Sequence, residues 1–420
     1  SVVNNRRVLQ EPVILAESTL TIGESMVIPL PDDSAMVLWR EAYAGVNFTV
    51  RASTLYPDGS FTPPVNAAQV STTTVDRFHA ATNSHGDLVL VFTDPTLEQV
   101  LVARYSVGDQ TWGTPVQVNP GLSGSLGIPS IAIDDNGRIM ASFVQNVAGD
   151  YDIHGTYSED ASTWTIPQVI DNLSFDVSTN TNSATVATAD GFVVAWSQNT
   201  GVENYFHARS FDAASGTWGS VYQGENEDGG SAAGIELLPL SGGRVMAIWV
   251  GFLAPNRLLA ATYDPVAGWS PGEYLDDFVQ APNWIAADTR GGDISVGYRK
   301  ISGGSDNTHF VRYSDGGWSS PIDVDAGLFG VTSHVEVVID SQGGTLVLRR
   351  QNASGVFDVL VDRFSPASGF GNTLPFEGQS LAVPAFPPAA GLMTNGSVVT
   401  TYAVDGGGSI ALYARLITLE

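Results

Sequence analysis

The chain has 420 residues, of which 43% are hydrophobic and 15% charged, and this composition excludes an intrinsically disordered protein. Acidic residues outnumber basic ones by 44 to 18, and the formal net charge of −26 disfavours binding to nucleic acid or to an anionic membrane surface. Because the sequence has no cysteine, it excludes disulfides, thiolate metal sites and cysteine nucleophiles.

The first predicted element is a short strand at 11–18, with the sequence EPVILAES. Pro12 stands at its start, as a proline does in most of the fourth strands of the repeats that follow it. No complete repeat precedes it. We therefore interpret 11–18 as a fourth strand that is separated in sequence from the rest of its repeat.

A repeat of about 52 residues follows and runs to the end of the chain. Each repeat contains a short apolar strand, a tight turn, a second strand, a third strand of alternating polarity and a short fourth strand. The most regular position, in the third strand, is occupied by Ser53, Arg104, Thr156, Arg209, Thr262, Arg312, Arg363 and Arg415. Four antiparallel strands per repeat, without helical periodicity, are typical of a β-propeller blade.

The sequence therefore predicts an all-β fold, an eight-bladed β-propeller of four-stranded antiparallel blades in a single domain over 1–420. The expected blades cover 25–70, 76–118, 128–170, 183–223, 232–275, 282–324, 334–377 and 384–420. The last of these lacks a fourth strand, and we expect 11–18 to supply it, which removes the unpaired sheet edges. Because the first two strands of the last repeat are rich in proline, a seven-bladed propeller remains the alternative.

The second strand of each repeat ends in a large side chain. These side chains, which we call the second-strand column, are Trp39, Phe92, Phe143, Trp196, Trp249, Tyr298, Arg349 and Tyr402. Aromatic side chains at a repeated position pack between neighbouring blades, so the column is expected to be core.

The turns between third and fourth strands carry the motif SEDASTW at 158–164 and SDGGW at 314–318. This motif resembles the Asp box of bacterial sialidases and related propellers. The resemblance implies a propeller architecture over the whole chain and a structural role for the turn, away from the active face. Sialidases have six blades and a longer box, and both features differ here.

Polar side chains interrupt the apolar first strands. Alignment of these strands places seven residues at equivalent positions facing a central tunnel: Val27, His79, Ser130, Thr185, Glu236, Trp284 and Glu336. Trp284 beside carboxylates could stack on a sugar ring, whereas the other interpretation is a polar lining for a water-filled tunnel. If the protein is an enzyme, Glu236 and Glu336 are the candidate acid and base or nucleophile of glycoside hydrolysis, and His79 is the candidate base of a polysaccharide lyase.

Three arginines follow the second-strand column directly: Arg40, Arg299 and Arg350. They come from repeats expected on one side of the propeller. Arginine binds carboxylate or sulfate with two parallel hydrogen bonds, so the cluster suits an acidic sugar. The alternative is structural ion pairing between blades, with Glu41, Asp94 or Asp405 as partners.

Acidic residues gather in the loops of the other repeats: Asp150, Asp152, Glu225, Glu227, Asp228, Asp276 and Asp277. No cofactor is expected. Calcium is the metal that the sequence leaves open, with Asp150 and Asp152 as the weak candidate ligands. A solvated acidic surface is the other interpretation of these residues.

These features favour an exported protein, secreted or on a bacterial cell surface, that binds a glycan or an extracellular protein on its loop-rich face. We expect a monomer that neither binds nucleic acid nor inserts into a membrane, since no apolar stretch is long enough to span a bilayer. The alternative is a carbohydrate-active enzyme, a glycosidase or polysaccharide lyase of an acidic glycan, with its active site in the central cleft. A purely structural module is the third possibility, and the sequence leaves open whether the protein is an enzyme.

Overall fold

The structure is a computed structural model of the chain. It describes residues 7–43, 47–68, 75–171, 176–177, 183–201, 204–224, 231–252, 255–277, 279, 285–302, 305–325, 331–353, 356–375, 388–405 and 408–419. The chain divides into two compact units. We call Ser1–Asn66 with Asn283–Glu420 the terminal unit and Ala67–Pro282 the middle unit.

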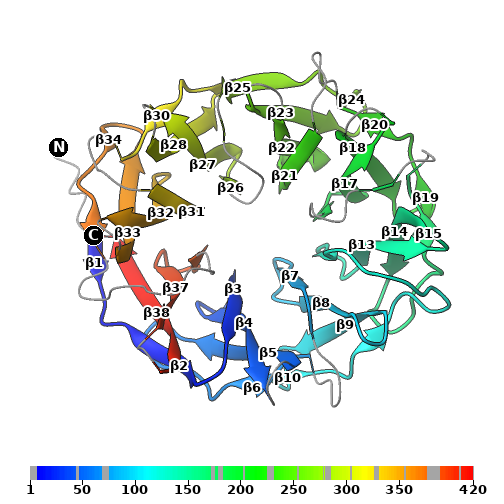
Figure 1. Cartoon of the computed structure of the whole chain (residues 1–420), viewed down its shortest axis with the longest axis horizontal. Coiled ribbons are helices and arrows are strands. Elements are labelled where there is room, and N and C mark those ends of the chain that lie inside the picture. Colours follow the sequence, from blue (N-terminus) through cyan, green and yellow to red (C-terminus); the bar gives the residue numbers. More distant parts are fainter. Residues whose placement is uncertain are drawn as a thin grey trace. The chain divides into compact units, whose positions relative to one another are not determined.

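The described residues form eight antiparallel sheets, numbered here as blades 1 to 8 in chain order (Figure 1). Their one helix is a single 3-10 turn at Ser241–Gly243. In six of the eight sheets the outermost strand is divided into two short pieces that pair with the same third strand. The prediction of an all-β, eight-bladed propeller with four-stranded antiparallel blades is confirmed, and the seven-bladed alternative is wrong.

The middle unit contains blades 2 to 5. Blade 2 consists of β7 (Phe78–Thr82), β8 (Leu88–Asp94), β9 (Gln99–Ser106), β10 (Thr111–Trp112) and β11 (Val116–Gln117), and blade 3 of β12 (Ser130–Ile133), β13 (Ile139–Val147), β14 (Asp150–Ser158) and β15 (Gln168–Val169). Blade 4 consists of β16 (Ala184–Ala187), β17 (Gly191–Asn199), β18 (Asn204–Asp212), β19 (Thr217–Trp218) and β20 (Tyr222–Gln223). Blade 5 consists of β21 (Ser231–Pro239), β22 (Val245–Phe252), β23 (Arg257–Asp264), β24 (Gly268–Trp269) and β25 (Glu273–Asp277).

The terminal unit contains blades 6, 7, 8 and 1. Blade 6 consists of β26 (Ile285–Arg290), β27 (Asp293–Ser302), β28 (Ser305–Ser314), β29 (Gly317–Trp318) and β30 (Ile322–Asp323), and blade 7 of β31 (Val331–Ile339), β32 (Thr345–Ala353), β33 (Val356–Ser365), β34 (Gly369–Phe370) and β35 (Leu374–Pro375). Blade 8 consists of β36 (Ala389–Leu392), β37 (Val398–Asp405) and β38 (Ile410–Leu419), with β1 (Arg7–Leu9) and β2 (Val13–Ser18). Blade 1 consists of β3 (Ile22–Pro29), β4 (Ala35–Tyr43), β5 (Asn47–Leu55) and β6 (Val65–Asn66).

Blade 8 is completed by the N-terminal strands, as predicted. β2 pairs antiparallel with β38 from Val13 opposite Ala414 to Ser18 opposite Ile410, and β1 extends the same edge. The two segments lie side by side in Figure 1, β2 in blue and β38 in red. Arg415 Nε also donates to the carbonyl of Gln10 at 2.7 Å. The edge of β38 is therefore paired by residues from the other end of the chain.

The second-strand column is buried in all eight blades, as expected of a core position. Several members stack on the residue opposite them in the third strand: Phe143 on His154 with ring centroids 5.4 Å apart, and Trp196 on His207 at 5.9 Å. In blade 7 the position is held by Arg349, which is as completely buried as the tryptophans. The column therefore requires a large side chain, but not an aromatic one.

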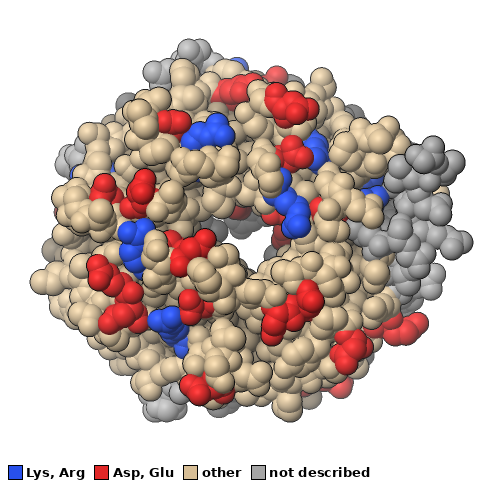
Figure 2. All heavy atoms as spheres, turned by 180° about the vertical axis from the view of Figure 1, so that it is seen from behind, with Lys and Arg blue, Asp and Glu red and all other residues tan. Residues whose placement is uncertain are grey.

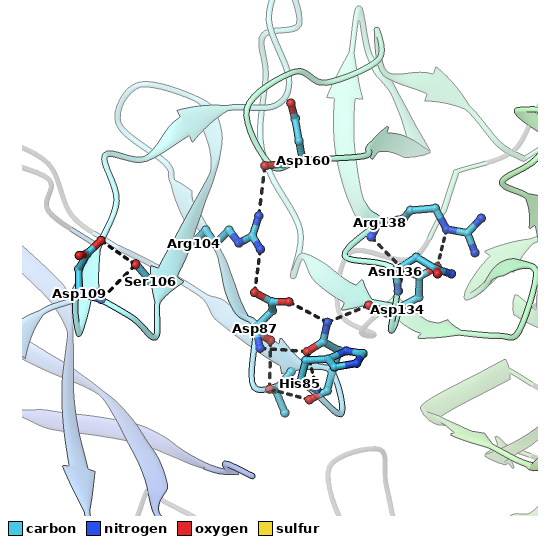
Figure 3. A network of polar contacts seen from close by, with 11 residues as sticks. His85, Asp87, Arg104, Ser106, Asp109, Asp134, Asn136, Arg138 and Asp160 are labelled. Carbon is cyan, nitrogen blue, oxygen red and sulfur yellow. Dashed lines mark hydrogen bonds and ion pairs between the residues drawn. The ribbon is translucent and has the colours of Figure 1, made fainter. Parts of the chain in front are cut away.

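Polar contacts join neighbouring blades outside the apolar core (Figure 3). Arg104 of blade 2 donates to Asp87 at 2.7 Å and to the carbonyl of Asp160 in blade 3 at 3.4 Å. Asn83 Nδ2 donates to Asp87 and also to the carbonyl of Asp134 in blade 3, at 3.0 Å. The regular third-strand arginine of the repeat thus links two blades at the surface.

In the part of the chain that the structure describes, no helix has the length and hydrophobicity of a membrane span.

Candidate functional site

A cavity of about 340 Å³ lies among the first strands of the terminal unit. We call it the first-strand cavity. Its lining comes from β3, β26, β31 and β36 and comprises Val27, Pro29, Ala287, Asp288, Thr289, Arg290, Glu336, Val337, Val338, Ile339, Ala390, Gly391 and Leu392. Most of these residues lie where the first strands end, next to the turns that lead into the second strands. The loops that join the blades and those between second and third strands, which form the loop-rich face, lie at the other end of the strands.

Two carboxylates from adjacent first strands line this cavity, Asp288 on β26 and Glu336 on β31. Asp288 Oδ2 accepts the backbone N–H of Ile339 from the neighbouring blade at 2.7 Å. Its Oδ1 accepts the N–H of Thr289 at 2.8 Å. Burial raises the pKa of Asp288 to about 6, although both N–H groups oppose that shift. The cavity therefore holds a positioned carboxyl group whose protonation changes near neutral pH.

Asp288 was not singled out by the sequence, because it occupies the position of a turn residue. Asp134 and Asp340 end equivalent first strands and accept N–H groups of their own turns, from Arg138 at 2.9 Å and from Gly344 at 2.9 Å. In blade 6 only two residues separate β26 from β27, and Asp288 bonds across to Ile339 instead. The short turn, visible in the sequence, is the feature from which a different partner for Asp288 could have been predicted.

Val27, another tunnel candidate, also lines this cavity, whereas Glu236 and His79 belong to the middle unit. Glu236 is on β21 of the middle unit, where burial raises its pKa to about 7. Glu336 belongs to the terminal unit, so their action as a catalytic pair stays a prediction. Trp284 lies outside the described residues, and its stacking role also stays a prediction.

His79 connects two blades of the middle unit. Its Nδ1 accepts the backbone N–H of Ile131 at 3.3 Å, which requires an unprotonated nitrogen. Burial lowers the pKa of His79 to about 4. The imidazole is therefore neutral at pH 7 and holds β7 against β12, and its role as a lyase base stays a prediction.

Two of the three arginines converge where blades 6 and 7 meet. Arg350 on β32 is paired in register with His334 on β31. The pKa of His334 is lowered to about 4, first by burial and then by the positive charges of Arg350 and Arg299. His334, which the sequence analysis did not single out, is thus the neutral neighbour of two guanidinium groups.

The structure also shows the surroundings of Arg40, the third arginine, and an ion pair formed by Arg299. Arg40 lies on β4 of blade 1, with its guanidinium 4.4 Å from the ring centroid of Phe48. Arg299 forms an ion pair with Asp306 on the facing strand of its own blade. This ion pair of Arg299 therefore lies within one blade. Burial lowers the pKa of Arg350.

The acidic loop residues do not assemble a metal centre among the residues that the structure describes, which contain no group of three or more His, Asp or Glu suited to a metal ion. Asp150 and Asp152 lie on β14, and the pKa of Asp152 is raised by burial. Asp277 pairs with Arg257 at 3.7 Å. The acidic residues Glu225, Glu227 and Asp228 lie outside the described residues.

Charge on the molecular surface is mixed. On the face drawn in Figure 2, arginine and lysine side chains are interspersed with acidic ones and form no continuous basic field. Positive potential is therefore local on this face, despite the net charge of −26 for the chain.

No protein-family model and no curated protein matches the chain. Among solved structures, it is similar to an ulvan lyase that represents a family of polysaccharide lyases, with a TM-score of 0.50 and 11% identity over 96% of this chain and 95% of that one. It is also similar to a prolyl endopeptidase, with a TM-score of 0.50 and 11% identity, covering 93% of this chain and 55% of that one. A sialidase from Streptococcus pneumoniae has 12% identity over 82% of this chain and 68% of that one, with a TM-score of 0.44. At such low identity the similarities to the lyase and the endopeptidase show the fold alone, and that fold is the β-propeller.

Proposed function

We propose that this protein is a glycan-binding propeller whose ligand occupies the first-strand cavity of the terminal unit. The observation that carries the proposal is that Asp288 and Glu336, from adjacent first strands, line one cavity of about 340 Å³. A cavity of roughly 300 Å³ or more falls in the size range of small-molecule sites. Carboxylates accept charge-assisted hydrogen bonds from hydroxyl groups, which is the interaction that a sugar offers repeatedly.

The charges of the cavity favour a neutral sugar. Asp288 and Glu336 would repel a carboxylate or sulfate, while Arg290 and Thr289 add donors to the lining. The arginines that the sequence analysis assigned to an acidic sugar are partly neutralised, because Arg299 already pairs with Asp306. We therefore favour a neutral glycan in this cavity over an acidic one.

A glycan array probed with the full chain, followed by titration calorimetry of the best ligand, tests the proposal. Glu336→Gln should weaken binding roughly 10- to 100-fold, since a hydrogen bond to a charged group is worth about 1.5–3 kcal/mol. Glu17→Gln, an exposed carboxylate on β2, serves as the matched control and should bind like the wild type. Unchanged affinity of Glu336→Gln for every array ligand would exclude this cavity as the glycan site.

Catalysis is the second candidate function, and the pKa of Asp288 favours it. A carboxyl group with a pKa of about 6 beside a second carboxylate is the arrangement that glycosidases use for acid and base. Polysaccharide turnover, followed as the release of reducing ends, should then be lost in Asp288→Asn even at saturating substrate. Tight binding of a glycan without turnover by the wild type would leave only the binding function.

We also propose that the protein acts as a secreted or surface-bound monomer, on a bacterial cell, and that its two units form one domain. The absence of cysteine and the strongly acidic composition support an exported protein whose stability does not depend on redox state. An extracellular protein remains the alternative partner on the loop-rich face. Fractionation of the host, with light scattering of the purified chain, tests location and oligomeric state.

A further inference from the structure

A second cavity, of about 320 Å³, lies between blades 3 and 4 in the middle unit. We call it the blade 3–4 pocket. It is lined by Met140, Gly155, Thr156, Tyr157, Glu159, Thr165, Gln168, Phe211, Ala213, Ala214, Ser215, Gly216 and Trp218. All of these residues belong to the middle unit, so the pocket is distinct from the first-strand cavity.

The pocket exists because Tyr157 packs differently from its equivalents in other blades. Tyr105, Tyr263 and Tyr313 each lie against the tryptophan of their own blade, with centroid distances of 5.4, 5.5 and 5.3 Å to Trp112, Trp269 and Trp318 respectively. Tyr157 instead lies against two rings of the next blade, Phe211 at 5.1 Å and Phe192 at 6.3 Å. Tyr157 of blade 3 therefore packs in the interface with blade 4.

Gly155 provides the space for an aromatic wall. A Cβ at this position would lie 2.5 Å from Trp218 Cζ2 and 3.0 Å from Cη2, so a larger residue would displace the indole. The Trp218 ring is half-exposed and lies 5.0 Å from the ring of Phe211. The two rings are tilted by 58° to each other and form an apolar wall on one side of the pocket.

The polar groups of the pocket include one buried donor without a partner. Tyr157 is 8% exposed, and its hydroxyl has no hydrogen-bond partner among the described residues. Burial raises the pKa of Tyr157, so the hydroxyl stays protonated and can donate. Buried polar groups are nearly always paired, and this hydroxyl belongs to a residue that lines the pocket, so it can donate to a ligand atom bound there. Exposed Glu159 and Gln168 complete the lining with acceptor and amide groups.

We propose that the blade 3–4 pocket binds one neutral sugar residue. Its ring packs on Trp218, an oxygen of the sugar accepts the hydrogen bond of the Tyr157 hydroxyl, and Glu159 and Gln168 bind sugar hydroxyls at the rim. The carboxylate of Glu159 disfavours an acidic sugar, and the polar rim disfavours a purely apolar ligand. This site is additional to the one proposed above, since none of its residues lines the first-strand cavity.

Tyr157→Phe tests the proposal, because it removes only the hydroxyl. The full chain is titrated with neutral hexoses, 6-deoxyhexoses and pentoses, with ligand-observed NMR to find the binding sugar and calorimetry to measure it. We expect Tyr157→Phe to lose roughly 5- to 20-fold in affinity, as for one hydrogen bond. Its melting temperature should stay the same or rise, because a buried unpaired group is removed. Tyr313→Phe, at the equivalent position on blade 6, is the matched control and should change neither quantity.

Gly155→Ala provides a second, independent variant. It should weaken binding by displacing Trp218. All variants are also measured in a Glu336→Gln background, which weakens binding at the first-strand cavity and so separates the two proposed sites. The proposal is overturned if no sugar of the panel binds at high millimolar concentration, or if Tyr157→Phe binds as well as the wild type. A fall in melting temperature without a change in affinity would likewise show a structural partner for the hydroxyl.

Discussion

Blades 5 and 7 fill the same position of the second-strand column with opposite chemistries. Trp249 in blade 5 and Arg349 in blade 7 are both completely buried. Trp249 stacks on Phe206 with centroids 4.5 Å apart and packs in a cluster with Leu259. Arg349 instead forms ion pairs, with Asp362 at 2.9 Å and with Asp325 at 3.7 Å, and donates to Gln351.

The fold therefore requires a side chain of large volume at this position, and the surrounding residues of each blade determine how that side chain is stabilised. A buried tryptophan needs only complementary packing. A buried guanidinium loses its hydration and must regain the equivalent interactions from carboxylates placed around it. The core of blade 5 should therefore tolerate changes that preserve volume, whereas that of blade 7 should tolerate only changes that preserve or remove the whole charge network.

The largest expected effect comes from truncating either side chain to alanine. Trp249→Ala should cost roughly 3–5 kcal/mol of unfolding free energy through lost packing. Arg349→Ala should cost about 3–5 kcal/mol because it leaves Asp325 and Asp362 buried without their cation. Denaturant unfolding measures both values. Arg290→Ala, an exposed arginine of the same unit, should stay within about 0.5 kcal/mol of the wild type, and an equally small loss for Arg349→Ala would refute the buried network.

A double variant sharpens the comparison. Arg349→Met with Asp362→Asn replaces the strongest ion pair by groups of similar size, and the asparagine can still accept from Thr373, which bonds Asp362 at 2.5 Å. Because the cost of the single arginine variant arises mainly from the unpaired charge, the double variant should recover about half or more of that loss. Denaturant unfolding of the two single variants and the double variant gives the coupling. Strictly additive losses would mean that Arg349 stabilises by packing, as Trp249 does.

The last effect is a pH dependence at Asp325, which lies between blades 6 and 7 in the chain and accepts from Thr308 and Thr332. Burial raises the pKa of Asp325 to about 7, from an ordinary value of 3.8, so the folded state binds this proton more tightly than the unfolded state. The stability contributed by protonated Asp325 is fully present below pH 3.8 and is lost as the pH rises through about 7.

Asp325→Asn should therefore change this pH response. Relative to Asp325→Asn, the wild type should lose on the order of 1 kcal/mol per pH unit between pH 4 and 7. Thermal unfolding at a series of pH values measures the difference. Glu17→Gln should follow the wild type throughout, and a constant difference between wild type and Asp325→Asn would contradict the raised pKa.

The fold was predictable because its signals repeat. The third-strand position from Ser53 to Arg415 recurs every 50–53 residues and the second-strand column every 49–53, and each copy reinforces the others. The pairing of β2 with β38 followed from an incomplete last repeat and a lone strand before the first. Such regularities specify strand pairing and alternation, which are properties of the backbone.

The site was predictable only in part, because it depends on departures from the repeat. Glu336 was found as a polar interruption of an apolar strand, and Arg299 and Arg350 by their shared position. Asp288 and Tyr157 were hidden, because each occupies a regular position and differs only in the partner that its side chain reaches. The residue with which each side chain forms its hydrogen bond or ring contact depends on the length of nearby turns and on how neighbouring blades pack. A single sequence specifies neither.

The pairing of β2 with β38 means that blade 8 can be completed only after β38 has been synthesised. Val13 and Ala414 are partners although about 400 residues separate them. At roughly 5–20 residues per second, a ribosome needs on the order of 20–80 s to synthesise these residues. During that time β2 has no partner strand. A message cut short before β38 therefore yields a protein with an open strand edge, which exposes it to proteases and chaperones. Blade 8 thus keeps an unpaired edge until translation has passed β38.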